Sequence, residues 1–351
     1  MRAARLYGPK DIRVQTEDAP PAPAPGEALL KILTVGVCGS DLHMYEAGRI
    51  GYTDITEPFI LGHEFMGEIV ALGRDALDGE HQPLQVGQRV AVEPAVPCWR
   101  CELCEHGHPN LCPNHYFYGL FPDDGALRER MLVSARNCFP MPDALSDDAG
   151  PLLETLGVAI HATDLSKIRI GHTVAVIGVG PVGALITRLA VLAGAARVMV
   201  FDKLDWRLQK ACDWGATQAF NVDQVDPVKA ALDVTGGRGV DVAIEAAWAD
   251  HSIQQAADMA RYGGRLTLVG IPPDDQLRLK HSVARRKGLT IVMSRRMKHT
   301  YPRAIELAVS GVVKLEELVS HRFDLAETAG AYASNAAYED GVNKVILRVG
   351  C

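Results

Sequence analysis

Two patterns of apolar residues divide the chain. Up to about residue 150, short apolar segments such as residues 28–33, 67–72 and 89–92 are separated by turns rich in Gly and Pro. This pattern predicts a β-rich, partly open barrel. From residue 173 to about 286, continuous apolar strands alternate with helical stretches, which predicts a parallel sheet covered on both faces. The last apolar run, residues 345–349, is expected to return to the first domain as a strand.

Length and charge narrow the classes of protein. The chain has 351 residues, 48% of them hydrophobic and 23% charged, which is enough for about two globular domains. The net charge of −7 disfavours nucleic acid as a partner, because phosphate neutralisation needs a basic surface. No apolar run of ~18 residues suggests a membrane span, and the first residues lack the apolar segment of a secretory signal. We therefore expect a cytoplasmic protein with no membrane partner.

Four of the eight cysteines lie within fifteen residues of one another: Cys98, Cys101, Cys104 and Cys112. In a reducing compartment such a cluster indicates a metal site rather than disulfides. Four thiolates fill the tetrahedral shell of a structural zinc ion, and an iron–sulfur cluster is the main alternative. A zinc module that binds nucleic acid is a further alternative, but the residues between these cysteines form no basic stripe. The sequence assigns no role beyond packing or a terminal position to Cys138, Cys212 and Cys351.

A glycine-rich turn, Gly178-Val179-Gly180-Pro181-Val182-Gly183, follows an apolar strand and precedes a helix. Gly178 permits the tight turn, Gly180 admits a pyrophosphate close to the backbone, and Gly183 allows close packing of helix on strand. Asp202, nineteen residues after Gly183, is placed to bind the hydroxyls of an adenosine ribose, and its charge favours NAD over NADP. Arg207 weakens that preference, since a nearby arginine can accommodate a 2′-phosphate. FAD is an alternative, although a fingerprint in mid-chain suits a nicotinamide enzyme better.

A second candidate metal site combines Cys38 with His63 and Glu64. Taken singly, Cys38 is typical of a small buried residue and His63 of a turn residue. One thiolate, one imidazole and one carboxylate together form a catalytic zinc set that leaves a position for water or substrate.

These motifs together resemble the zinc-dependent medium-chain dehydrogenases, in their sorbitol (polyol) and threonine dehydrogenase branch. The resemblance covers nearly the whole chain, from the segment around Cys38 through the four-cysteine loop to the glycine-rich turn. It implies an α/β fold in which a Rossmann doubly wound parallel sheet accompanies a β-rich, GroES-like catalytic domain. We expect residues 1–155 and 291–351 to form the zinc-binding catalytic domain and residues 156–290 to form the dinucleotide-binding domain.

The resemblance also implies individual roles. Cys38 and His63 would bind the catalytic zinc, with Glu64 or Glu154 as the third ligand or close partner. The chain has no cysteine between Cys138 and Cys212, so the two-cysteine shell of simple alcohol dehydrogenases is excluded and the polyol branch is favoured. Ser40 and His43 would relay the substrate proton. Cofactor contacts are expected at Gly178, Gly180, Pro181, Val182, Gly183, Asp202, Lys203, Arg207, Val269, Gly270 and Ser294.

The expected reaction is hydride transfer from a secondary alcohol of a polyol or sugar to NAD. Substrate contacts are expected at Tyr45, Phe117, Glu154 and Arg296, with a solvated pair of arginines as the alternative for Arg296. A phosphorylated polyol or threonine is an alternative substrate, and a non-catalytic NAD-binding sensor is an alternative of a different class. The resemblance further implies a homotetramer or homodimer.

Overall fold

The computed structural model describes residues 1–272 and 274–350, and the chain divides into two compact units. Unit 1 contains residues 1–157 together with the C-terminal segment that begins at Lys298, and unit 2 contains residues 158–297. The predicted boundary between residues 155 and 156 falls inside helix α3 (Leu152–Ser166). Cys351 lies outside the described residues.

The second boundary was predicted too early in the chain. The division between residues 290 and 291 would cut strand β18 (Thr290–Met293). This strand pairs in parallel with β17 (Ala260–Leu268), so it belongs to the sheet of unit 2. The strand is itself apolar in sequence (Thr290-Ile291-Val292-Met293), but an apolar pattern does not tell which sheet a strand joins, because that depends on strand pairing.

The main sheet of unit 1 is built from strands far apart in the sequence, in the order β12-β8-β7-β3-β20-β19, with β11 also paired to β3. These strands are β3 (Glu27–Gly36), β7 (Glu64–Leu72), β8 (Arg89–Val92), β11 (Arg130–Ser134), β12 (Cys138–Pro140), β19 (Val319–Asp324) and β20 (Lys344–Arg348). Strand β20 pairs antiparallel with β3, so the return of the last strand to the first domain is confirmed. Gly36 of β3 pairs with Glu64 on one side and Ile346 on the other, which brings the chain end close to the candidate metal site.

Smaller elements complete unit 1. A three-stranded sheet and two short ribbons contain β1 (Arg2–Gly8), β2 (Asp11–Thr16), β6 (Phe59–Ile60), β4 (Arg49–Ile50), β5 (Thr53–Asp54), β9 (Ala95–Val96) and β10 (Tyr116–Phe117). The helices are α1 (Gly39–Ala47), α2 (Glu102–Glu105), α9 (Tyr301–Val309) and α10 (Thr328–Ala336). The core includes Leu30, Ile32, Phe65 and Leu347, which are fully buried on the paired strands.

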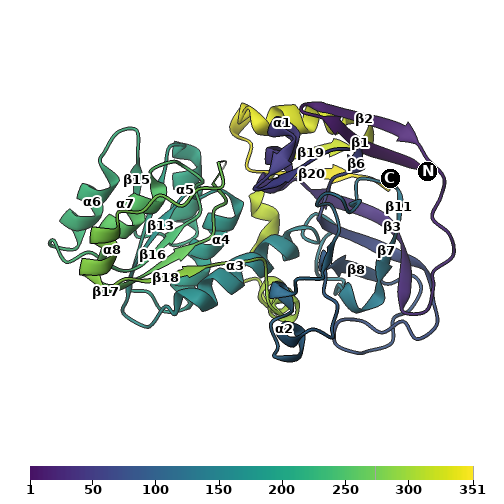
Figure 1. Ribbon diagram of the computed structural model, residues 1–351, viewed down its shortest axis with the longest axis horizontal. Coiled ribbons are helices and arrows are strands. Elements are labelled where there is room, and N and C mark those ends of the chain that lie inside the picture. The colour runs from purple at the N-terminus through teal and green to yellow at the C-terminus, as the bar shows by residue number, and fades with distance from the viewer. Residues whose placement is uncertain (273, 351) are drawn as a thin grey trace. The chain divides into compact units, whose positions relative to one another are not determined.

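Unit 2 contains a six-stranded parallel sheet in the order β15-β14-β13-β16-β17-β18 (Figure 1). The remaining strands are β13 (Thr173–Ile177), β14 (Arg197–Asp202), β15 (Gln218–Asn221) and β16 (Val240–Glu245). The order corresponds to 3-2-1-4-5-6 in the Rossmann fold, so the predicted doubly wound sheet is confirmed. Side chains of β16 are buried throughout, as a strand covered on both faces requires.

Helices connect the parallel strands of unit 2 and pack around its sheet (Figure 1). They are α4 (Pro181–Leu192), α5 (Asp205–Asp213), α6 (Pro227–Val234), α7 (Ser252–Met259) and α8 (His281–Lys287). Across the two described ranges, every helix is too short or too polar to cross a bilayer.

Candidate active site

Three ligand types converge in unit 1, as the sequence predicts. Ligand atoms of Cys38, His63 and Glu64 all lie within 4.8 Å of one another. Cys38 caps the N-terminus of α1, while His63 and Glu64 are buried at the start of β7. A thiolate, an imidazole and a carboxylate at this spacing suit one zinc ion and leave a fourth position for an exchangeable ligand.

Asp41 holds two members of this trio and was missed by the sequence analysis. Its side chain is fully buried in the first turn of α1. One oxygen, Oδ1, lies 3.1 Å from His63 Nδ1, and Oδ2 accepts a hydrogen bond of 3.0 Å from the backbone N–H of Cys38. With Nδ1 engaged by the carboxylate, Nε2 is the nitrogen left for a metal ion. The motif Cys38-Gly-Ser-Asp41 contained the signal, because an acid three residues after an N-cap faces back toward it.

Lys344 neutralises Glu64 and was also missed. Its ammonium lies 2.8 and 2.5 Å from the two carboxylate oxygens, and both side chains are almost completely buried. Thr155 donates a further hydrogen bond of 3.0 Å to Glu64 Oε1. Burial raises the pKa of Glu64, but Lys344 and His63 together lower it below its ordinary value, so the carboxylate is ionised. Gly36 is required beside it, because a Cβ there would lie 2.3 Å from Glu64 Oε2.

Glu154 lies in the first turn of α3 and is buried. Burial is the main reason that its pKa is raised to about 7. It does not belong to the trio whose ligand atoms lie within 4.8 Å of one another. Its role as third ligand or close partner of a metal therefore stays a prediction.

Ser40, expected to relay the substrate proton, and Phe117, an expected substrate contact, lie next to the trio. The Ser40 hydroxyl is 3.4 Å from His63 Nε2, and the Phe117 ring lies 5.6 Å from the His63 ring, centroid to centroid. Asp123 positions Phe117 by accepting a hydrogen bond of 2.8 Å from its backbone N–H. His43 follows Ser40 by three residues on α1, a spacing that places the two on the same helix face.

The other two predicted substrate residues are placed differently. Tyr45 is buried in the core of unit 1, with its ring 5.5 Å from that of Tyr332. Arg296 lies in unit 2 and adopts a left-handed backbone with φ of 57°. Contact of either residue with a substrate stays a prediction.

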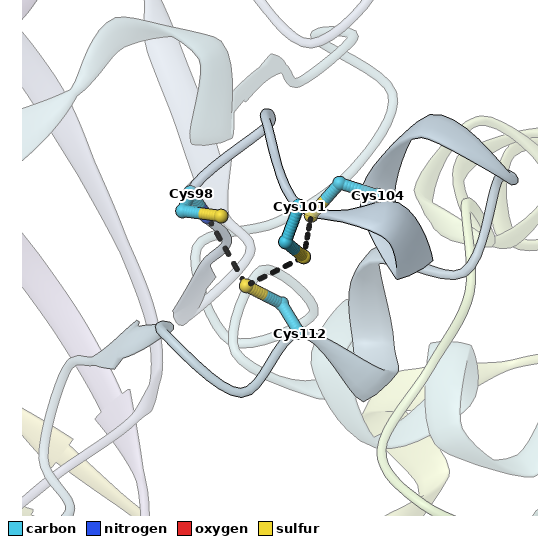
Figure 2. Close-up of side chains that lie close together, drawn as sticks. All are labelled: Cys98, Cys101, Cys104 and Cys112. Atoms are coloured by element: carbon cyan, nitrogen blue, oxygen red, sulfur yellow. Dashed lines mark hydrogen bonds between the residues drawn. The ribbon is translucent and has the colours of Figure 1, made fainter.

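The four-cysteine loop forms a second site in unit 1, and Figure 2 shows its side chains pointing toward one another. Cys101 Sγ lies 3.5 Å from Cys104 Sγ and 3.8 Å from Cys112 Sγ. All four sulfur atoms lie within 4.8 Å of one another. Zn–S bonds of about 2.3 Å in a tetrahedron place sulfurs about 3.8 Å apart, so one zinc ion fits this cage. A multi-iron cluster would hold its thiolates farther apart, and we therefore favour zinc.

The glycine-rich turn of unit 2 has the form that a pyrophosphate requires. Gly178 has a φ of 83°. Gly180 is the N-cap of α4, and Pro181 is the first residue of that helix. A Cβ on Gly183 would lie 1.9 Å from the Gly178 carbonyl oxygen, so only glycine permits this packing of helix on strand. The unpaired N–H groups of the helix start can then bind an anion.

Asp202 lies at the end of β14, and its carboxylate stabilises the glycine-rich turn through a hydrogen bond. Its Oδ2 accepts a hydrogen bond of 2.8 Å from the Val179 N–H, and its Oδ1 accepts one of 3.0 Å from the Leu204 N–H. Each oxygen keeps a second lone pair for a ribose hydroxyl. A Cβ on Gly180 would lie 3.5 Å from Arg207 Nη1, so a cation lies beside the same turn. The preference for NAD over NADP stays a prediction.

The remaining expected cofactor residues lie at the carboxyl ends of strands in unit 2, where ligands of such sheets bind. Val269 and Gly270 follow β17, and Ser294 follows β18, donating a backbone hydrogen bond of 2.8 Å to Leu268. Lys203 directly follows β14 and accepts a bond of 3.2 Å from Asn221 through its carbonyl.

Comparison with known proteins agrees with this geometry. Residues 24–143 match the family model of the alcohol dehydrogenase GroES-like domain, and residues 181–310 match that of the zinc-binding dehydrogenases. Sorbitol dehydrogenase of Bacillus subtilis (strain 168) is 37% identical over 347 residues, which cover 99% of this chain and 97% of that protein.

Two solved structures share the fold along the whole chain. Galactitol-1-phosphate dehydrogenase of Escherichia coli has a TM-score of 0.88 at 27% identity, covering 99% of this chain and 100% of that one. An alcohol dehydrogenase of Thermus sp. ATN1 has a TM-score of 0.89 at 30% identity, with the same coverage of both chains.

Asp41→Asn tests the role of Asp41. An asparagine has one acceptor oxygen, whereas His63 Nδ1–H and the Cys38 N–H need two, so one contact is lost. We expect zinc affinity or kcat to fall roughly 10- to 100-fold. Zinc content after dialysis and steady-state kinetics measure this, with the exposed Asp54→Asn as control. An Asp41→Asn protein with unchanged zinc retention and kcat would contradict the assignment.

Cys112→Ser tests the four-cysteine site. Cys112 is the buried member of the group, and its loss opens the tetrahedral shell. We expect the zinc content, measured by mass spectrometry of metals, to fall from two ions per chain to one, with a lower unfolding temperature. Cys212→Ser, which removes a thiol outside both groups, should change neither. Retention of both ions by Cys112→Ser would refute this site.

Proposed function

We propose that this chain, which belongs to the zinc-dependent medium-chain dehydrogenases and within them to the sorbitol dehydrogenase branch, oxidises a secondary alcohol of a free polyol or sugar. The hydride acceptor is NAD. The substrate is a small molecule, and the reaction requires zinc in the site formed by Cys38, His63 and Glu64.

The composition of the trio carries this proposal. A sensor that only binds NAD has no need of a thiolate, an imidazole and a carboxylate arranged around an open position. The carboxylate in place of a second cysteine separates this site from that of simple alcohol dehydrogenases. Lys344 offsets the negative charge of Glu64, while the Asp41 carboxylate and a Cys38 thiolate still attract a divalent cation.

The chain's own residues move the substrate proton. Zinc, when bound at the trio, supplies Lewis-acid chemistry that lowers the pKa of an alcohol. The Ser40 hydroxyl, which lies 3.4 Å from His63 Nε2, accepts the proton of the substrate hydroxyl as it donates its own proton to His43. His43 then takes it toward solvent. Burial lowers the pKa of His43, so its imidazole is neutral near pH 7 and able to accept a proton.

Other residues orient the reactants. Phe117 provides an apolar wall beside His63, which excludes water from one side of the alcohol carbon. The glycine-rich turn and Asp202 hold the pyrophosphate and adenosine ribose of the dinucleotide, whose nicotinamide supplies the hydride acceptor. Arg296 offers several N–H donors to adjacent hydroxyls of a polyol.

We further propose that the chain forms a homodimer or homotetramer in the cytoplasm. Strand β18 is the edge of the sheet in unit 2, and Met293 on it is 63% exposed. Ile291 is also exposed, so an apolar edge is open to pairing with a second copy about a two-fold axis. No disulfide joins the cysteines of the described ranges, which supports a reducing compartment.

A substrate screen with both cofactors tests the proposed reaction. We expect four- to six-carbon polyols to reduce NAD faster than NADP, followed by the ultraviolet absorbance of NADH. Cys38→Ser should abolish turnover while NADH binding and the metal of the four-cysteine loop remain, because the trio loses its thiolate.

Other outcomes of the screen reject specific parts of the proposal. If kcat/KM is higher for phosphorylated polyols or for threonine than for free polyols, the proposed substrate class is wrong and that compound class takes its place. Turnover of no alcohol by a zinc-loaded protein that binds NADH would favour the sensor. Full activity of Cys38→Ser would remove the catalytic role of the trio.

Met293→Lys tests the proposed interface, because a lysine on an edge strand opposes strand pairing. We expect light scattering after size exclusion to show half the mass of the native assembly. Val225→Lys, at an exposed apolar position after β15, is the control and should leave the mass unchanged. A monomeric native protein, or an unchanged mass of Met293→Lys, would refute this interface.

A further inference from the structure

Glu245 is a buried carboxylate in unit 2 to which the sequence assigned no role. It ends β16 and has no exposed surface. A charge in this position requires strong hydrogen bonding to offset the loss of water. Strand β16 is the first strand in the second half of the parallel sheet, and it pairs with β13. Its carboxyl end, where Glu245 lies, is therefore beside the glycine-rich turn that follows β13.

One carboxylate oxygen organises the turn that follows the strand. Glu245 Oε1 accepts hydrogen bonds from the backbone N–H groups of Ala247 at 2.8 Å and Trp248 at 3.1 Å, and from the Ser252 hydroxyl at 2.7 Å. Trp248 has a φ of 63°, a left-handed conformation that costs a non-glycine residue free energy. The carboxylate therefore stabilises an otherwise unfavourable turn.

This turn of residues 246–248 lies between two predicted cofactor segments. On one side, a Cβ on Gly178 would lie 2.6 Å from Ala247 Cα. On the other side, a Cβ on Gly270 would lie 2.7 Å from Glu245 Oε2 and 2.9 Å from Trp248 Cδ1. The backbone carbonyl of Glu245 also accepts a hydrogen bond of 2.8 Å from the Val269 N–H.

The second carboxylate oxygen has spare hydrogen-bonding capacity. Glu245 Oε2 is buried and receives no hydrogen bond from any residue in the ranges 1–272 and 274–350. It lies toward Gly270, so its charge is directed to the end of β17 rather than to the glycine-rich turn. The glycine-rich turn has a separate support, because the Val179 N–H is held by Asp202.

We propose that Glu245 is a positioning residue for the nicotinamide half of the dinucleotide, acting through the turn of residues 246–248 and through Gly270. The inference rests on the proposed NAD-dependent function. In the Rossmann fold each half of the sheet binds one half of the dinucleotide. Asp202 and the glycine-rich turn serve the adenosine half from β13 and β14, and Glu245 serves the other half from β16.

Binding of two ligands to Glu245→Gln tests this proposal. The amide keeps the size of the side chain but adds an N–H₂ group that cannot accept hydrogen bonds, which disturbs Oε1 or the space beside Gly270. Titration calorimetry should show NADH bound about tenfold more weakly, and ADP-ribose, which lacks nicotinamide, changed less than about threefold. KM for NAD should rise by a similar factor.

A matched control lies on the same strand. Asp241 is a buried acid near the start of β16, where Arg238 and Arg261 contact its carboxylate. Asp241→Asn should lower the unfolding temperature and leave the ratio of the two binding constants unchanged. Ser252→Ala removes only one donor to Oε1 and should show a smaller shift of the same kind as Glu245→Gln, which keeps the test usable if that variant folds poorly.

The outcomes separate this inference from the proposed function. Equal weakening of NADH and ADP-ribose by Glu245→Gln, or no change in either, would overturn the positioning role. Failure of the native protein to bind NADH would reject the proposed function itself. A selective loss of NADH affinity with an unfolding temperature close to that of Asp241→Asn would establish the role of Glu245.

Discussion

The buried ion pair between Lys344 and Glu64 is the interaction on which the rest of unit 1 depends. The two residues are 280 positions apart, and neither side chain is more than 2% exposed. Removing one partner of a buried pair costs about 3–5 kcal/mol, because it leaves an uncompensated charge. Since Glu64 also belongs to the ligand trio, formation of the last strand and assembly of the trio are coupled. Gly36 lies on β3, between β7 and β20, and its lack of a side chain leaves room for the carboxylate of Glu64.

The two metal sites of unit 1 are built in different ways. The four cysteines lie on one loop, so local backbone turns bring their sulfur atoms together. The trio instead combines the start of α1 with the start of β7, and Asp41 and Lys344 hold it from two directions. A closed shell supplied by one loop suits a structural ion, and an open shell with separate supports suits chemistry, because its ligands keep their geometry when the fourth ligand changes.

Unit 2 uses buried carboxylates for a similar purpose. Asp202 accepts backbone N–H groups from the glycine-rich turn and from the start of α5, and Glu245 accepts those of the turn after β16. Both lie at carboxyl ends of parallel strands. Turns at this edge cannot pair with neighbouring strands, so side-chain oxygens satisfy their N–H groups instead. The backbone that meets the cofactor is thereby set before the cofactor binds.

Features whose causes are local could be predicted from the sequence alone. The parallel strands, the glycine-rich turn, the four-cysteine loop and the strand character of residues 345–349 each follow from spacing or apolar pattern within a short segment. The trio of Cys38, His63 and Glu64 came from the combination of motifs. The domain boundary at β18 could not be predicted in this way, because the pairing of β18 with β17, and not its apolar sequence, places the strand in unit 2.

Only the tertiary structure decided which polar groups support those motifs. Asp41 contacts His63, which is 22 residues away in the sequence, and Lys344 contacts Glu64, which is 280 residues away. Tyr45, predicted as a substrate contact, lies in the core of unit 1. Apolar periodicity reports which face of an element is buried, but it contains no information about which buried charge neutralises which. That choice depends on strand order and register, and these are set by the packing of the whole chain.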